Sequence, residues 1–284
     1  MVLDCVKSFR GQVPRELQVL VVDAGEEQVD ETALQELWSN SRVIRSQVRN
    51  AAAQRNAGVR EARGDTIVFL DDDCFVQPGW WPGIIAPLAD PCVGAVAGAV
   101  WCNENPKLTS RRGGYVNLFG VPVQVTHRGP DAPRDVDWAL TTNMAVRKDV
   151  FQEAGAFAEV YGIYDEDVDL GLKIKRCGKR IMFEPGAAVY HYFTKTPRKS
   201  PTKRTSFLAG RNRALLLVRN YGLSLRLAMF VLTAPFVCLW SALVKSVRCG
   251  YTAVGHAVAY VAGMVKGIVD GVRHPVKNDS GGNG

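Results

Sequence analysis

The stretch IVFLDDDCFVQPGWW, residues 67–81, joins four apolar residues to three consecutive carboxylates, Asp71, Asp72 and Asp73. Adjacent carboxylates repel one another, so the triplet costs stability unless a cation lies against it. One interpretation is a polar turn, because Asp is common where a strand ends. The other is a site for a divalent cation, because carboxylate oxygens are the ligands that Mg²⁺ and Mn²⁺ prefer. This stretch alone leaves both interpretations open.

Length and composition describe a globular chain. Its 284 residues suffice for one full core and a smaller appendage, and 47% of them are hydrophobic and 22% charged. Seven cysteines are scattered without a C-x-x-C pair, which argues against a disulfide framework or a zinc site and for a reducing compartment. The start, MVLDCVKSFRGQVPREL, lacks the apolar run of a secretory signal.

The net charge of +7 is concentrated in one segment. Between Phe193 and Arg213 the chain carries seven positive residues and no acid: Lys195, Arg198, Lys199, Lys203, Arg204, Arg211 and Arg213. The remainder of the chain is therefore formally neutral. Because the charge does not describe the whole protein surface, we expect no nucleic-acid partner.

Short apolar runs alternate with helical patterns in the first half of the chain. Three runs are typical of buried strands: LQVLVVDAG (17–25), TIVFLDDD (66–73) and VGAVAGAVWC (93–102). Helices are predicted between them, over about 31–41, 46–62 and 79–89. This alternation predicts an α/β fold with a doubly wound, mostly parallel sheet. Since ligands bind beyond the carboxyl ends of such strands, Asp23 and the triplet should converge on one crevice.

The second half is less regular at first. Residues 103–136 are rich in Gly, Pro and Arg, and we predict a long mobile excursion that shapes a second substrate's site. Regular patterning returns after Trp138. It predicts helices over 146–155 and 165–178, then two short strands within 180–193.

A second acidic cluster, YDEDVD, opens the helix predicted at 165–178. The helix dipole stabilises acids at a helix start by about 0.3–1 kcal/mol each, which accounts for one or two of them. It does not account for four in five positions, Asp165, Glu166, Asp167 and Asp169. A carboxylate placed here, beside a site for metal and phosphate, could act as a general base. The two interpretations remain open on the pattern alone.

Taken together, five segments resemble the family 2 glycosyltransferases, which have the GT-A fold. In order they are VVDAG (21–25), RNAGVREARGDTIVFLDDDC (55–74), NMAVRKDVFQEAGAF (143–157), YDEDVDLGLKIKRCGKRIMFEPGAAVYH (164–191) and RNRALLLVRNY (211–221). The resemblance covers roughly residues 3–220 and implies a GT-A domain over 1–220. It also implies a nucleotide-sugar donor.

The resemblance implies a role for each matching residue. On the donor side these are Asp23 for the nucleobase, Arg55 nearby, Asp71 for the ribose, and Asp72 sharing either duty. For a Mn²⁺ or Mg²⁺ ion they are Asp73, with Asp71 and His191 beside it, although His191 could be an ordinary strand histidine. Glu166 and Asp167 match the catalytic pair, with Asp167 as the base.

The chemistry implied is a single displacement that inverts the anomeric carbon. The metal stabilises the charge that grows on the departing diphosphate. The anomeric carbon becomes oxocarbenium-like, as in glycoside hydrolysis. Asp167 removes the proton of the acceptor hydroxyl as its oxygen attacks from the opposite face.

The start departs from the family pattern. Members usually begin with an apolar strand that ends in a Pro-x-Tyr-Asn-like turn, whereas MVLDCVKSF reads as the helix after that strand. We therefore expect the first strand to be absent. Ala158 in GAFAE also stands where an acid is common.

The carboxyl end is apolar. Residues 227–244 hold 18 residues without a charge, about 27 Å as a helix against a hydrocarbon core of roughly 30 Å. A weaker run follows at 250–265. We predict a membrane-associated segment over 221–272 and a disordered tail over 273–284. The two runs could form a hairpin in the bilayer, lie in its interface, or be buried soluble helices.

The basic residues at 195–213 favour membrane association with the catalytic domain in the cytoplasm, because such segments attract anionic lipid. Alternatively, one of them, Arg211, contacts the donor diphosphate. The leading hypothesis is thus a membrane-associated transferase acting on a lipid-linked or cell-envelope glycan. The alternatives are an inactive membrane partner subunit and a sugar nucleotidyltransferase, which would want a Gly-rich basic loop near the start that this sequence lacks. The sequence does not indicate the oligomeric state.

Overall fold

The structure, a computed structural model, describes residues 1–102, 109–128, 132–192, 202–236 and 252–275. The chain forms two compact units. Unit 1 comprises Met1–Tyr115 and Pro122–Thr196, and unit 2 comprises Val116–Val121 and Pro197–Gly284. The second unit thus begins before residue 220, where the sequence-based boundary lies.

Unit 1 alternates strands and helices as predicted. Its strands are β1 (Val19–Asp23), β2 (Ser41–Arg45), β3 (Thr66–Leu70), β4 (Cys74–Val76), β5 (Val93–Cys102), β6 (Thr109–Val116), β7 (Pro122–Arg128), β8 (Arg134–Val136), β9 (Asn143–Arg147) and β10 (Arg180–His191). Its helices are α1 (Val2–Lys7), α2 (Glu31–Leu37), α3 (Ala51–Glu61), α4 (Trp80–Ile85), α5 (Lys148–Glu153) and α6 (Glu166–Arg176), with 3₁₀ turns at Ala86–Ala89 and Glu159–Tyr161.

The sheet is mixed, which corrects the prediction of a mostly parallel one. In the described residues β1 and β2 pair in parallel as a two-stranded sheet, and an eight-stranded sheet has the central order β3-β9-β5-β10-β4. β9 runs antiparallel to both β3 and β5, whereas β5 and β10 are parallel. The physical reason is that Asn143 of β9 pairs with Leu70, the last residue of β3. The chain therefore enters β9 beside the carboxyl end of β3, and β9 runs antiparallel to β3.

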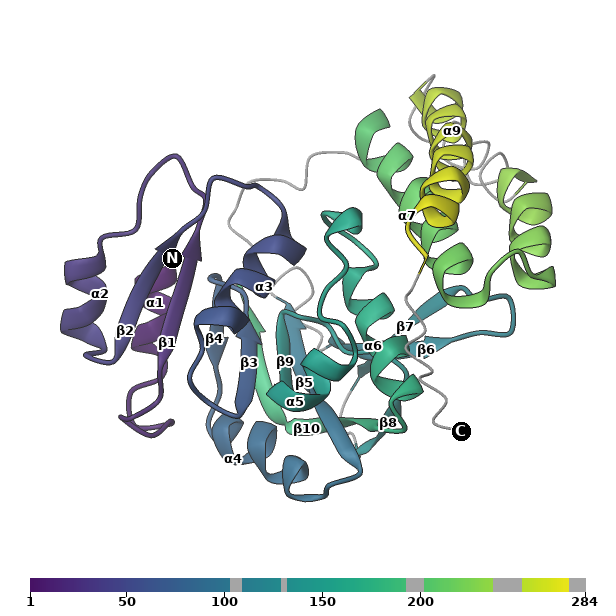
Figure 1. The fold of residues 1–284 in the computed structure, drawn as a ribbon. Helices are drawn as coiled ribbons and strands as arrows, with labels where there is room; N and C mark the ends of the chain where they lie inside the picture. The colour runs from purple at the N-terminus through teal and green to yellow at the C-terminus, as the bar shows by residue number, and fades with distance from the viewer. Residues whose placement is uncertain (103–108, 129–131, 193–201, 237–251, 276–284) are drawn as a thin grey trace, which may run out of the picture. The chain divides into compact units, whose positions relative to one another are not determined.

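Both faces of the main sheet are covered, as the alternation predicted. Along β5, Ala95, Ala97 and Ala99 pack in one cluster with residues of α3, α5 and α6. Val96 and Val100 pack in the other with residues of α1, α2 and α4. Figure 1 shows α5 and α6 lying across one face of the strands. Alternate side chains of one strand thus belong to opposite cores, as the pleat requires.

Three local predictions need correction. The helix predicted over 31–41 ends at Leu37, and the one over 46–62 begins at Ala51, capped by the Asn50 side chain. Between them SRVIR forms β2, because its five residues pair in register with β1. The excursion at 103–136 contains β6, β7 and β8, apart from 103–108 and 129–131, which lie outside the described residues. Finally, 180–191 is one strand with an irregularity between Glu184 and Ala188, not two strands.

Unit 2 contains the turn between β6 and β7, at Val116–Val121, and is otherwise helical in its described part. It contains α7 (Lys203–Tyr221), a helical segment at 225–236 and α9 (Thr252–Arg273). α7 and α9 approach so closely that an added Cβ on Gly210, Gly263 or Gly267 would lie 2.0–2.1 Å from a backbone oxygen of the other helix. No helix in the described residues is long and apolar enough to cross a bilayer. Much of the apolar run 227–244 and most of the tail at 273–284 lie outside those residues.

Candidate active site

Strand register brings two predicted metal ligands together. β4 pairs antiparallel with β10 so that His191 lies opposite Cys74, and the Tyr192 backbone N–H donates to the Asp73 carbonyl at 2.9 Å. This pairing sets the His191 ring beside Asp73, with Nε2 2.7 Å from Oδ1. Two residues that are far apart in the sequence therefore form one donor set.

The donor set fits a divalent cation. Ligand atoms of Asp73, Cys74 and His191 lie within 4.8 Å of one another. Burial, followed by the charge of Asp71, raises the pKa of the Cys74 thiol far above its usual range, and the thiol lies 3.9 Å from the Thr142 carbonyl. Asp73 and His191 offer a carboxylate and an imidazole as ligands. These suit Mn²⁺, and the carboxylate also suits Mg²⁺.

Asp71, predicted both for the donor and for the metal, is held on two sides. The Thr142 hydroxyl donates to Asp71 Oδ2 at 2.8 Å, and Arg55 Nη2 lies 3.7 Å from Oδ1. Thr142 directly precedes β9, whose pairing with β3 places it beside the triplet. Sequence reasoning missed this residue, because only that strand pairing reveals its position.

Arg55 joins the two acidic clusters. Its Nη1 donates to Glu166 Oε1 at 2.8 Å, while its Nη2 is the group that faces Asp71. The guanidinium lies over the Phe157 ring, 5.8 Å from its centroid, a geometry that favours a cation. Through Arg55 the triplet and the acids of α6 approach one another at Asp71 and Glu166.

Two acids at the start of α6, Glu166 and Asp167, have raised pKa values. Burial raises the pKa of Glu166, and Arg55 opposes that effect; the buried Oε2 atom makes no hydrogen bond. Burial, then the charges of Glu166 and Asp165, raises the pKa of Asp167 well above its usual value. A carboxylate with a raised pKa is a stronger base. Backbone strain marks the same place, because Tyr164 and Asp165 have φ of 72° and 65°.

Two further groups at the triplet, Asp72 and the Cys5 thiol, have raised pKa values. Burial raises the pKa of Asp72, with Asp73 and Asp71 adding repulsion. Burial also raises the pKa of the Cys5 thiol to about 12, and the same three carboxylates contribute. Cys5 belongs to α1, and its Sγ lies 3.8 Å from the Asp71 carbonyl. The amino-terminal helix thus packs directly beneath the triplet.

Asp23 is buried in contacts of its own loop. It accepts the backbone N–H groups of Gly25 and Val29 at 2.8 and 2.9 Å and pairs with Arg45. The Val29 bond lowers the pKa of Asp23 most, and Gly25 and Arg45 lower it further. Arg45 was not predicted, because residues 42–45 lay between the two predicted helices and were assigned to no element. Asp23 therefore shapes the 24–29 loop, and its predicted nucleobase contact stays a prediction.

One further acid and one predicted donor ligand lie elsewhere. Asp169 is fully buried and accepts the Tyr161 hydroxyl at 3.1 Å, with Lys173 3.2 Å away. It is therefore structural. Arg211 belongs to unit 2, where it pairs with Asp270. Its contact with a donor diphosphate stays a prediction.

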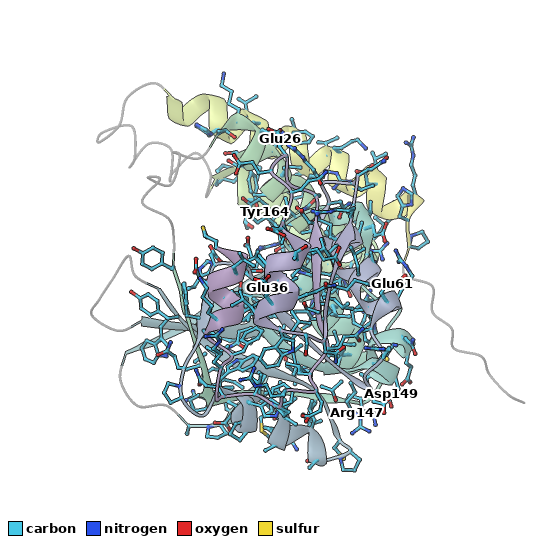
Figure 2. All side chains as sticks on the ribbon, turned by 90° about the vertical axis from the view of Figure 1, so that its left-hand side faces the viewer. Glu26, Glu36, Glu61, Arg147, Asp149 and Tyr164 are labelled. Carbon is cyan, nitrogen blue, oxygen red and sulfur yellow. The ribbon has the colours of Figure 1, made fainter. Side chains whose placement is uncertain are left out.

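The candidate site lies at one end of unit 1. Tyr164, at the start of α6, is far from Arg147 and Asp149, which lie at the opposite end of the strands (Figure 2). Since β3 and β10 run the same way, their carboxyl ends, at Leu70 and His191, share this edge. This placement agrees with the rule that ligands bind beyond the carboxyl ends of the strands.

Comparison with known proteins decides the family. The family model described as Glycosyl transferase family 2 matches residues 1–155, more than half of the chain. The chain belongs to glycosyl transferase family 2. The resemblance found in its motifs is thereby confirmed.

Three curated proteins are similar to this chain over 173–215 residues. The O-antigen biosynthesis protein RfbC of Myxococcus xanthus is 25% identical over 190 residues, 62% of this chain and 15% of that protein. The pre-mycofactocin glycosyltransferase of Mycobacterium tuberculosis is 28% identical over 173 residues, 60% of this chain and 35% of that protein. The N-acetylglucosaminyl-diphospho-decaprenol L-rhamnosyltransferase of the same species is 26% identical over 215 residues, 66% of this chain and 70% of that protein. The chain thus spans about a third or less of the first two relatives.

Solved structures confirm the GT-A fold. GalNAc-T7, solved with UDP, GalNAc and Mn²⁺, has a TM-score of 0.55 at 16% identity, over 75% of this chain and 46% of that one. The mannosyltransferase PcManGT from Pyrobaculum calidifontis, solved with GDP-Man and Mn²⁺, also has a TM-score of 0.55. It is 14% identical, over 95% of this chain and 83% of that one. At these identities the likeness is one of fold.

Proposed function

We propose that this family 2 member is an inverting glycosyltransferase that moves a sugar from a nucleotide-sugar donor to a hydroxyl group of a glycan or lipid-linked acceptor. One observation carries the proposal. Arg55 touches both Asp71 and Glu166, so the aspartate triplet and the acids of α6 face one site. Separate acidic patches would allow only metal binding or only base catalysis.

The triplet side of the site is proposed to hold the donor. Asp71, fixed by the Thr142 hydroxyl, has one oxygen aimed at Arg55 and is placed to accept from a ribose hydroxyl. Asp73 and His191 would hold Mn²⁺ or Mg²⁺, which stabilises negative charge on a leaving diphosphate. Asp23 and its ordered loop are proposed to bind the nucleobase.

The α6 side is proposed to activate the acceptor. Asp167 has a raised pKa and lies one residue from Glu166, which Arg55 anchors. It takes the proton from the acceptor hydroxyl as that oxygen attacks the anomeric carbon. Attack on the face opposite the leaving group inverts the configuration. Glu166 positions the helix start through its bond to Arg55.

The names of two relatives support the proposed acceptor. The matched rhamnosyltransferase bears the name of a diphospho-decaprenol acceptor, and RfbC that of O-antigen biosynthesis. We therefore propose a lipid-linked or cell-envelope glycan acceptor and a catalytic unit that works at the cytoplasmic membrane surface. The basic character of unit 2 supports that location.

A donor screen tests the proposal. The purified full chain is incubated with UDP-, GDP- and dTDP-sugars with Mn²⁺, and release of the nucleoside diphosphate is measured with and without EDTA. We expect at least one donor to turn over, and EDTA to abolish that turnover. Release that persists unchanged in EDTA contradicts the metal-assisted mechanism.

The second candidate is a catalytically inactive partner subunit. The observation that favours it is the separation of β1 and β2 from the main sheet in the described residues, because Asp23 lies on the smaller sheet. Calorimetry with UDP, GDP and dTDP in the presence of Mn²⁺ distinguishes the two. A folded chain that binds none of them is the inactive subunit.

A further inference from the structure

Unit 2 contains a hairpin tip with two exposed apolar side chains. Asn117 holds the tip, because its side-chain oxygen accepts the N–H groups of Phe119 and Val121, both at 3.0 Å. Gly120 completes the turn with φ of +74°. As a result Leu118 and Phe119 project outward, 83% and 48% exposed. The hydrogen bonds of Asn117 hold the turn in a conformation that exposes both apolar side chains, so no loop motion is needed to expose them.

The helical segment at 225–236 is apolar on two opposite faces. Leu227, Phe230 and Ala234 are buried in the core of unit 2. The other face carries Leu225, Leu232 and Phe236, which are 76%, 67% and 73% exposed. Their spacing of seven and four residues places them in one line along the helix. The outward face of a soluble surface helix is normally polar, so this one is unusual.

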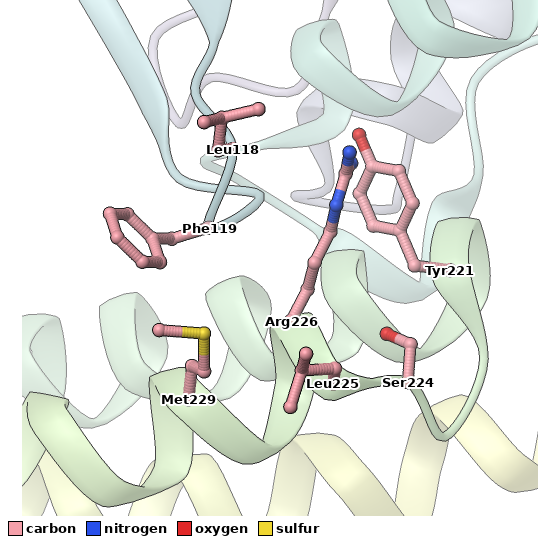
Figure 3. Close-up of a pocket in the computed structure, with 7 residues that line it drawn as sticks. All are labelled: Leu118, Phe119, Tyr221, Ser224, Leu225, Arg226 and Met229. Atoms are coloured by element: carbon pink, nitrogen blue, oxygen red, sulfur yellow. The ribbon is translucent and has the colours of Figure 1, made fainter.

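Side chains of the hairpin tip and of this helix line one pocket (Figure 3). This pocket is open and has a volume of about 480 Å³, with Leu118 and Phe119 on one side and Leu225 and Met229 on the other. Arg226 lies at its edge with the guanidinium 4.4 Å from the centre of the Tyr221 ring. We call Leu118, Phe119, Leu225, Leu232 and Phe236 the docking face. A contiguous exposed apolar patch rimmed by polar groups is typical of an interaction site.

Charge indicates which partner this face meets. Residues 197–284 carry thirteen Lys and Arg against two Asp, a net charge of +11, whereas the whole chain carries +7. The rest of the chain is therefore net negative, at −4. Exposed aliphatic and aromatic residues on a strongly basic unit match an anionic lipid surface, which offers acyl chains next to negative headgroups.

We propose that the docking face lies on an anionic lipid bilayer, with its leucines and phenylalanines inserted to interfacial depth and the basic residues of unit 2 at the headgroups. This inference deepens the proposed membrane location and names the surface responsible. It does not depend on sugar transfer, so the two can fail separately.

Vesicle co-sedimentation of the full chain, without donor or metal, tests it. We expect binding to vesicles of phosphatidylcholine with phosphatidylglycerol, at least tenfold weaker binding to phosphatidylcholine alone, and weaker binding at high salt. Phe119→Ser/Leu232→Ser should lower the partition coefficient at least tenfold. Leu118→Ser is a second variant, because a side chain 83% exposed has little packing to lose. Val48→Ser, which removes a 55% exposed valine of unit 1, is the matched control and should bind as the parent chain does.

Three results would overturn the proposal. The first is a parent chain that stays in the supernatant with anionic vesicles. The second is an unchanged partition coefficient in the Phe119→Ser/Leu232→Ser and Leu118→Ser variants, whose thermal unfolding is checked in parallel. The third is a dimer in sedimentation velocity that these variants dissociate, since the docking face would then join two copies of the chain. Donor turnover measured in the same preparations reports on the proposed transferase activity independently.

Discussion

His191 Nε2 lies 2.7 Å from Asp73 Oδ1, and strand pairing rather than sequence proximity creates this contact. The Tyr192 N–H bond to the Asp73 carbonyl fixes the two backbones. The pair is therefore preorganised before any ion or donor arrives. Such preorganisation is what a ligand site on a rigid scaffold requires.

Loss of either member of this pair should weaken metal binding. We expect Asp73→Asn and His191→Gln each to lower the affinity for Mn²⁺, measured by calorimetry with the nucleoside diphosphate present, by at least about tenfold. Cys92→Ser, at an exposed free thiol outside the site, is the control and should leave the affinity unchanged. An unchanged affinity in His191→Gln would show that His191 is an ordinary strand histidine.

Removing the cation between the acidic clusters should destabilise unit 1. Arg55→Met leaves Glu166, whose side chain is 7% exposed, buried without its ion-pair partner. We expect a loss of about 2–3 kcal/mol in the free energy of unfolding, measured by urea denaturation. The control is Arg42→Met, which breaks a pair with Glu61 in which both side chains are 51% exposed. That change should cost less than about 1 kcal/mol, and equal losses in the two variants would contradict the buried bridge.

The pH dependence of transfer should report on Asp167. The proposed base must be deprotonated, and its pKa is raised by burial and by Glu166 and Asp165. The rate should therefore rise with pH through an acidic limb above the ordinary Asp value of about 3.9. Arg55 lowers this pKa, so Arg55→Met should move the limb to still higher pH while Arg42→Met leaves it in place. A limb that does not move in Arg55→Met would argue for another base.

Acid should weaken unit 2 through Asp270. Burial raises the pKa of this carboxyl, but hydrogen bonds from Lys266 and Arg211 outweigh it and hold the pKa below its ordinary value. Because its pKa is lower in the folded chain, the ionised carboxylate stabilises the folded state at pH values above the unfolded-state pKa of about 3.9. This stabilisation is lost as the pH falls through the folded-state pKa. We expect Asp270→Asn to destabilise at pH 7 by a few kcal/mol (about 2–4). The difference from the parent chain should shrink towards pH 3.

This prediction also separates two roles of Arg211. As the partner of Asp270, which is 6% exposed, it should lower the unfolding temperature when changed to Met. If Arg211→Met instead keeps that temperature and raises the KM for the donor, the contact with the donor diphosphate is the main role. A difference between Asp270→Asn and the parent chain that is constant from pH 7 to pH 3 would contradict the linkage.

The sequence by itself determined the strands that end in carboxylates, the acidic start of α6 and the family. Each of these features is a local pattern, because an apolar run that ends at Asp can be recognised from a few consecutive residues. It did not determine the direction of β9, which depends on the edge at which the chain re-enters the sheet. It also missed β2, whose five residues become a strand only through pairing with β1.

Only the tertiary structure decided which acids share a site. Asp167 and Asp169 look alike in the sequence, yet two positions along a helix turn them about 200° apart. Asp169 is consequently sealed against Tyr161 and Lys173, while Asp167 stays partly exposed beside Glu166. In the same way Thr142 and Arg55 reach Asp71 through strand pairing and helix packing, which place residues distant in sequence within hydrogen-bonding or ion-pair range.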